Sequence, residues 1–230
     1  MASGGRAALM LGLQQFWQQT DGVGRAVALL LLAMSISAWV VILWKAWVLR
    51  RARRDIARAV PAFWAADTID SARSQLQTLD REQVLAPLLA AATARPMSGT
   101  LETSGVLASQ LTRRLRDALH SGLAHLQYGQ VLLASIGSTA PFVGLFGTVW
   151  GIYHALVSIS AAGSITIEKV AGPVGEALIM TAAGLAVAIP AVLAYNLYGK
   201  WVAVCEAELE GFAHDLREMV LGADRTPQAV

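Results

Sequence analysis

Three polar side chains within apolar stretches are the residues of this sequence best suited to chemistry. Glu176 is the only acid between Glu168 and Glu206, and it stands near the start of a long apolar run. An ionisable group at membrane depth is costly, so it usually faces a bundle interior or a wet cavity. Glu176 is therefore a candidate for proton transfer. The alternative is a carboxylate at a loop end, in the lipid headgroup region.

Two threonines fall at nearly the same depth as each other. If Val131 and Lys200 lie at one inner level, Thr148 is 17 residues outward and Thr181 is 19. At ~1.5 Å per residue the two threonines differ by about 3 Å in depth, and Glu176 lies roughly 7 Å further out. We predict that the three line a polar, proton-conducting path. Alternatively, each threonine only bonds its own backbone carbonyl one turn back.

The apolar stretches that carry these residues are long enough to cross a bilayer. Hydrophobic residues make up 55% of the 230 residues and charged residues 15%, below the roughly 25% of soluble domains. About 20 apolar residues cross the hydrocarbon layer. We predict an all-α membrane protein with transmembrane helices at 26–49, 131–160 and 172–199. The predicted remainder comprises an outer segment at 1–25, a cytoplasmic helical domain at 50–130, an outer loop at 161–171 and a cytoplasmic C-terminal helix and tail at 200–230.

Lysine and arginine placement predicts the direction of these spans. Residues 45–130 contain twelve of them, whereas 1–25 and 161–171 together contain three. The positive-inside rule then places the N-terminus outside and 45–130 in the cytoplasm. The basic cluster after the first span is expected to contact anionic lipid rather than nucleic acid. Its residues are Lys45, Arg50, Arg51, Arg53 and Arg54.

The cytoplasmic stretches are predicted to be helical. Alanine, leucine, glutamine and arginine dominate them, and β-branched residues are sparse. A break is predicted around 95–99, where proline and glycine occur close together. From about Thr103 leucines recur every four positions, which indicates a long helix running into the second span. A further helix over 202–221 is expected to extend the third span.

Glycines in the second and third spans predict close helix packing. Small residues let membrane helices approach each other, and this favours an oligomeric assembly. The residues concerned are Gly144, Gly147, Gly151, Gly175 and Gly184.

Several other chemistries have no signature in this sequence. The single cysteine, Cys205, excludes an internal disulfide and a site with several cysteine ligands. There is no Walker-type glycine loop, no paired-histidine motif and no Ser-His-Asp arrangement. We therefore predict a protein that is not an enzyme and that needs neither a metal nor an organic cofactor.

Two segments resemble a known family. Residues 137–153, GSTAPFVGLFGTVWGIY, and 170–196, VAGPVGEALIMTAAGLAVAIPAVLAYN, are similar to the second and third spans of the ExbB/TolQ/MotA family of proton-channel motor subunits. Together they cover about a quarter of the chain. The three-span layout with a large cytoplasmic segment is similar across the rest.

The resemblance implies a machine in the inner membrane of a Gram-negative bacterium. A homopentamer would surround the transmembrane helices of the partner ExbD, and an ExbD aspartate would exchange protons near Thr148, Thr181 and Glu176. The motion would energise TonB for import of siderophores and vitamin B12. Residues 171–175 resemble the ExbB branch more than the TolQ branch, which serves Tol-Pal envelope constriction. A passive scaffold, which needs no acid within the membrane, is the remaining alternative.

Overall fold

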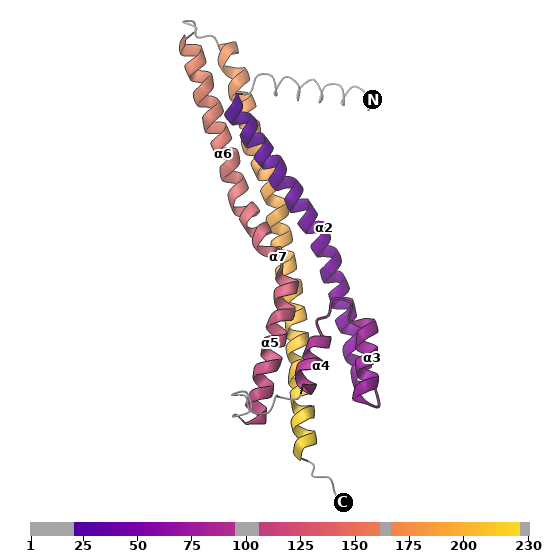
Figure 1. Ribbon diagram of the computed structural model, residues 1–230. Helices are drawn as coiled ribbons and strands as arrows, with labels where there is room; N and C mark the ends of the chain where they lie inside the picture. Colours follow the sequence, from indigo (N-terminus) through magenta and orange to yellow (C-terminus); the bar gives the residue numbers. More distant parts are fainter. Residues whose placement is uncertain (1–20, 95–105, 162–166, 226–230) are drawn as a thin grey trace, which may run out of the picture. The chain divides into compact units, whose positions relative to one another are not determined.

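The computed structural model describes residues 21–94, 106–161 and 167–225, without the side chains of Ala161, 167–170, Pro173, Glu176 and 224–225. Over these residues every regular element is a helix (Figure 1). This confirms the predicted all-α class for the described part of the chain. The helices are α2 (Gly22–Trp64), α3 (Ile69–Leu79), α4 (Ala86–Thr93), α5 (Leu107–Gln127), α6 (Gln130–Ala161) and α7 (Ile167–Arg225).

Three of these helices are long and apolar enough to cross a membrane. They are α2, α6 and α7, and each contains one predicted span. Within the chain, only 17%, 28% and 33% of their most apolar windows are buried. Most of this apolar surface must therefore be covered by lipid or by other chains. The direction in which the spans cross stays a prediction.

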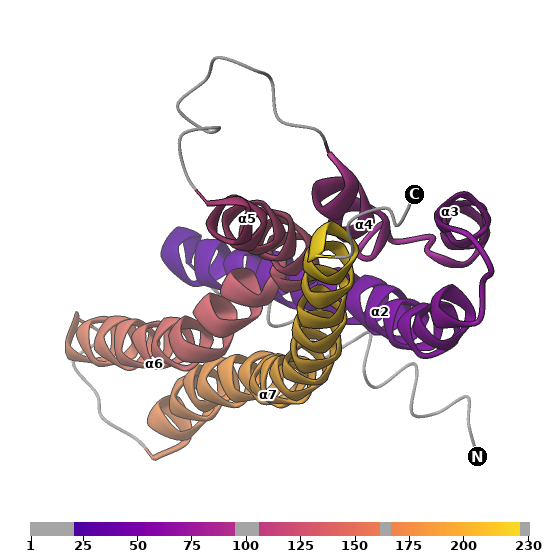
Figure 2. The ribbon, with the colours of Figure 1, turned by 90° about the horizontal axis from the view of Figure 1, so that it is seen from below.

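The chain divides into two compact units. The described part of the first comprises 21–42 and 131–195, and thus the N-terminal parts of α2 and α7 together with almost all of α6. In both views α6 runs beside the N-terminal part of α7 (Figures 1 and 2). Both helices continue through an internal proline, Pro141 in α6 and Pro190 in α7.

The second unit is built around leucines from five helices. It comprises Leu43–Gln130 and Asn196–Val230, over their described residues. Figure 2 shows α5 alongside the C-terminal part of α7, where the Arg217 side chain donates a 3.0 Å hydrogen bond to the Thr112 hydroxyl. Helix α7 runs unbroken to Arg225, as predicted for the extension of the third span. The core includes Leu49, Ile56, Leu76, Leu88, Leu126, Leu209 and Leu216, all at most 1% exposed.

The loop before α4 contains a buried carboxylate, Asp80, that binds the backbone at the start of the helix. Asp80 is 3% exposed and accepts hydrogen bonds from the backbone N–H groups of Val84, Leu85 and Ala86 at 2.7–3.0 Å. These are N–H groups at a helix start, which have no partner within the helix. Asp80 therefore fixes where α4 begins.

The predicted continuous helix into the second span is wrong. Helix α5 ends at Gln127 and α6 begins at Gln130, with Tyr128 and Gly129 between them. Gly129 has φ of 83°, a left-handed conformation that glycine adopts without steric cost. This is the usual position of glycine just after a helix end, and it outweighs the leucine periodicity. The predicted break at 95–99 lies outside the described residues.

Candidate functional site

Helices α6 and α7 pack closely along a line of contact, here called the seam, where two glycines leave room for the opposite backbone. A Cβ atom on Gly144 would lie 2.6 Å from the carbonyl oxygen of Met180 and 3.1 Å from the Cα of Gly184. A Cβ atom on Gly184 would lie 2.6 Å from the carbonyl oxygen of Ala140. Because those neighbours are backbone atoms, a larger residue at either position must push the helices apart. Gly144 and Gly184 thus lie where the backbones of α6 and α7 approach closely, and their role in assembly stays a prediction.

One turn from Gly144, the two predicted threonines touch across this seam. Thr148 is 6% exposed, and its hydroxyl contacts the hydroxyl of Thr181. Thr148 Oγ1 also lies 3.1 Å from the carbonyl oxygen of Gly144 and 3.3 Å from that of Ala177. A threonine hydroxyl donates one proton and accepts others. The Thr148 hydroxyl oxygen therefore takes part both in the contact with its own helix, one turn back, and in the contacts with α7.

Glu176 belongs to the same helix as Thr181. Its backbone lies in α7, directly before Ala177, whose carbonyl oxygen faces Thr148. Five residues of helix place Glu176 about 7.5 Å along the axis from Thr181. The side chain of Glu176 lies outside the described residues, so its orientation toward the threonines stays a prediction.

Two further predicted glycines pack within the first unit. A Cβ atom on Gly147 would lie 2.9 Å from Val27 Cγ1 on α2 and 3.1 Å from Met180 Cβ on α7. A Cβ atom on Gly151 would lie 3.0 Å from Ala177 Cβ. Gly147 thus faces both neighbouring helices, and the seam extends along three turns of α6.

Gly175 behaves differently from the other four glycines. It is exposed, and a Cβ atom there would meet nothing within 4 Å. Its predicted packing role has no counterpart within this chain and stays a prediction for contact with another chain. Gly137 does pack, because a Cβ atom there would lie 2.5 Å from Val192 Cγ2. Glycine spacing in the second span was the signal for it.

A carboxylate that the sequence reasoning missed links the start of α2 to α6. Asp21 Oδ2 accepts a 2.6 Å hydrogen bond from the Trp150 indole, and Oδ1 accepts one from the Gly24 backbone N–H at 2.8 Å. Burial acts to raise the pKa of Asp21, but these hydrogen bonds, with His154 and Arg25 nearby, outweigh it and hold the pKa below its usual value. Aspartate just before an apolar helix is a capping signal, although its distant partner is not visible in sequence.

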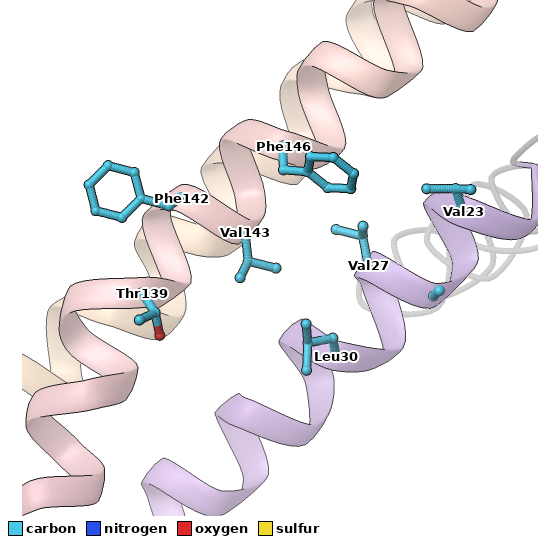
Figure 3. A pocket seen from close by; sticks show the side chains of 8 residues that line it. Val23, Val27, Leu30, Thr139, Phe142, Val143 and Phe146 are labelled. Atoms are coloured by element: carbon cyan, nitrogen blue, oxygen red, sulfur yellow. The ribbon is translucent and has the colours of Figure 1, made fainter.

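A shallow groove lies between α2 and α6 (Figure 3). Its volume is about 440 Å³, and Thr139 supplies the one polar side chain of its lining. Such a surface offers nothing to bind a charged ligand and suits hydrocarbon. The lining residues are Val23, Ala26, Val27, Leu30, Thr139, Phe142, Val143 and Phe146.

Three arginines of the basic cluster, Arg50, Arg51 and Arg54, line a second groove, in the second unit. Its volume is about 610 Å³, and its lining combines five arginines with one acid and an apolar end. Arg51 lies 3.3 Å from Glu82 and stacks over Trp47, whereas Arg50 and Arg53 lie over Trp201. An arginine-rich groove with tryptophan at its apolar end fits the predicted headgroup contact. The groove is lined by Leu43, Ala46, Trp47, Arg50, Arg51, Arg54, Asp55, Arg58 and Arg81.

Lys45 does not line that groove, and the lipid contact predicted for it is wrong because it is buried within the chain. Its relative exposure is 0%. Its ammonium group donates to the carbonyl oxygens of Leu126 and Tyr128, the latter at 2.6 Å. A cation at the C-terminal end of a helix satisfies carbonyls that have no partner within the helix. Lys45 turns inward because the end of α5 offers these acceptors.

Comparison with known proteins identifies a family and several relatives. Residues 80–211 match the MotA/TolQ/ExbB proton channel family. The matched segment includes α5, α6 and the part of α7 that carries Thr181. A channel family supports the prediction that the chain acts in transport and not as an enzyme.

Individual relatives cover almost the whole chain. The biopolymer transport protein ExbB of Neisseria meningitidis is 37% identical over 92% of this chain and 98% of its own length. The ExbB of Xanthomonas campestris pv. campestris is 39% identical over 88% of this chain and 83% of its own. The Tol-Pal system protein TolQ of Haemophilus influenzae is 29% identical over 83% and 85%. This chain therefore belongs to the MotA/TolQ/ExbB proton channel family.

Proposed function

We propose that the chain is an ExbB-type stator subunit that conducts protons in the inner membrane of a Gram-negative bacterium. Five copies form a ring around the transmembrane helices of ExbD, with the N-terminus of each copy outside. Proton passage moves the two kinds of subunit relative to each other. That motion performs work on TonB and drives import of siderophores and vitamin B12 through the outer membrane.

The observation that carries this proposal is the contact between Thr148 and Thr181 in an apolar layer. Lipid offers no hydrogen-bond partners, so polar groups at this depth face a bundle interior or a wet cavity. Two touching hydroxyls can accept a proton on one side and donate one on the other. Glu176, about a turn and a half along α7, supplies the one ionisable group of the predicted path.

The driving force is sufficient for mechanical work. Moving one elementary charge across 100 mV is worth about 2.3 kcal/mol. A few protons per cycle therefore supply enough free energy for a conformational step. The chain itself needs no bound cofactor for this.

The uncovered apolar surface supports a ring embedded in lipid. At most a third of each apolar window is buried within the chain. Gly175, open on the surface of α7, offers room for a helix of another chain. The arginine groove would hold the phosphates of anionic lipids at the cytoplasmic edge.

Identity favours the ExbB branch over TolQ. The two ExbB relatives described above are 37–39% identical, and TolQ proteins of Haemophilus influenzae and Pseudomonas aeruginosa are 29–31% identical. Complementation tests the assignment. We expect the gene to restore siderophore-dependent growth to a strain lacking ExbB. Rescue only of the detergent sensitivity and cell chaining of a TolQ-deficient strain would assign it to the Tol-Pal system.

Substitution of the membrane acid tests proton coupling against a passive scaffold. We expect Glu176→Ala and the near-isosteric Glu176→Gln to insert and to assemble with ExbD, yet to abolish energised siderophore uptake. The matched control is Glu208→Ala, which removes an exposed acid from the same helix beyond the predicted span, and it should retain uptake. Wild-type uptake by an assembled Glu176 variant would favour the scaffold.

A further inference from the structure

The buried lysine of α2 has a role that neither proton transfer nor lipid contact explains. Lys45 is fully buried, and both acceptors of its ammonium group are backbone carbonyls rather than carboxylates. Burying a charged group is costly unless hydrogen bonds compensate it. A lysine at a membrane edge can normally extend its ammonium group to water instead. Lys45 therefore stays inside because the acceptors there hold it.

Those acceptors belong to the interruption between α5 and α6. The last carbonyls of a helix lack partners within it. Here the helix ends at Gln127, the Tyr128 N–H bonds the His125 carbonyl oxygen at 3.3 Å, and Gly129 takes φ of 83°. Lys45 supplies donors to carbonyls at this end, and its charge favours the C-terminal end of the helix dipole.

The surroundings hold α2 against this turn. The Trp44 ring meets the Tyr128 ring edge-on, with centroids 5.8 Å apart and planes at 88°. Leu126, whose carbonyl oxygen accepts from Lys45, and Leu49, one turn along α2 from Lys45, are both fully buried. The turn is thus joined to α2 by one charged contact and one aromatic contact, from adjacent residues.

The position of the turn in the chain gives the contact its significance. The chain leaves the second unit at Gln130, two residues after Tyr128, and it enters that unit at Leu43, two residues before Lys45. Helix α6, which carries Thr148, begins at Gln130. Whatever fixes the turn therefore fixes the start of the helix that bears the candidate proton path.

We propose that Lys45 is a positioning residue that locks the α5–α6 turn to α2 and so sets where α6 begins. Its ammonium group acts as a brace on the backbone of the turn. The brace links the cytoplasmic helix α5 to the membrane helix α6 without itself carrying protons. Its effect on transport, unlike its effect on the turn, rests on the proposed function.

The test compares Lys45→Met with a matched variant, Lys200→Met, in the purified full-length assembly in lipid nanodiscs. Lys200 is an exposed lysine of α7 near the predicted inner edge of the third span. Backbone amide exchange is measured at 126–131. We expect exchange there to be at least tenfold faster in Lys45→Met and unchanged in Lys200→Met. Unchanged exchange in assembled Lys45→Met would overturn the proposal.

A second variant covers failure of the first to assemble. Lys45→Gln keeps a shorter, neutral N–H donor, and we expect faster exchange than in the wild type but slower than in Lys45→Met. Wild-type exchange in assembled Lys45→Gln, with Lys45→Met unable to assemble, would equally refute the brace. Glu176→Gln serves as the separate reference, because it should stop uptake while leaving exchange at the turn unchanged. Amide exchange at the turn thus tests the role of Lys45, whereas loss of uptake in Glu176→Gln tests the proton path separately.

Discussion

The seam between α6 and α7 depends on residues without side chains, whereas the turn between α5 and α6 depends on a long side chain. At the seam, Gly144 and Gly184 have no side chain and let two backbones approach, and the hydroxyls of Thr148 and Thr181 meet one turn away. At the turn, a long charged side chain is present, and Lys45 fills the space between α2 and the end of α5. The comparison shows that close packing in the membrane and a broken helix beside it need different residues.

The two regions also differ in what a substitution destroys. A larger residue at the seam meets backbone atoms, which cannot move aside without separating the helices. Loss of Lys45 removes the donor from the buried contact with Leu126 and from the part-buried contact with Tyr128, but it creates no clash. We therefore expect assembly to depend on the seam and local order to depend on the turn.

The largest effect is expected from filling the seam. Gly144→Leu should prevent stable assembly, because its side chain would collide with the backbone of α7 around Met180 and Gly184. The control is Gly211→Leu, since a Cβ atom at Gly211 meets nothing within 4 Å. Size-exclusion chromatography in detergent reports the assembly. Gly144→Leu eluting as the wild-type assembly would contradict the packing described here.

The next effect is expected from removing the hydroxyls without changing shape. Thr148→Val and Thr181→Val should assemble normally, but energised uptake should fall by about a hundredfold, the lower end of the range for a positioned proton-transfer group. The control Thr139→Val removes an exposed hydroxyl from α6 that bonds only one turn back, to the Ser135 carbonyl oxygen. Equal uptake in all three variants would mean that the threonine pair is merely structural.

A smaller, pH-dependent effect is expected from Asp21. Its pKa is lowered in the folded protein, so the ionised carboxylate stabilises the fold. This contribution to the free energy of unfolding is present above the unfolded pKa of about 4 and is lost as the pH falls through the lower pKa of the folded protein. Asp21→Asn should therefore lower the free energy of unfolding by about 1 kcal/mol at pH 7. The wild type and the variant should converge only as the pH falls below the lowered pKa of Asp21. A difference between them that stays constant with pH would exclude the charged hydrogen bonds as its cause.

The smallest effect is expected at Cys205, in the second unit. Its thiol is fully buried, and burial with Glu208 nearby raises its pKa to about 11, although Arg53 opposes the shift. Because the thiolate is the reactive form, iodoacetamide should leave the folded protein unlabelled at pH 8. Labelling should appear only after denaturation. Rapid labelling of the native assembly would show that this core opens.

The seam was largely predictable from sequence, and the turn was not. Helical rise and bilayer thickness are constants, so counting residues from Val131 and Lys200 brought Thr148 and Thr181 to one depth. Glycine spacing likewise indicated that the second and third spans pack closely against other helices, without naming the partner helix. These inferences need only local periodicity and the demands of lipid.

The contacts that the sequence did not reveal join residues far apart in the chain. Lys45 bonds residues 81 and 83 positions away, and Asp21 bonds one 129 positions away. No periodicity reports such partners. The interruption at Gly129 has a local signal, a glycine after a run of helix formers, but the leucine repeat that precedes it favours a continuous helix.

A density map of the assembly in lipid with ExbD tests the central claim most directly. We expect the Glu176 carboxyl group and the Thr148 and Thr181 hydroxyls to face the axis of the ring, next to the ExbD helices. A map in which Glu176 points outward into the acyl chains, or into bulk solvent beyond the membrane, would contradict it.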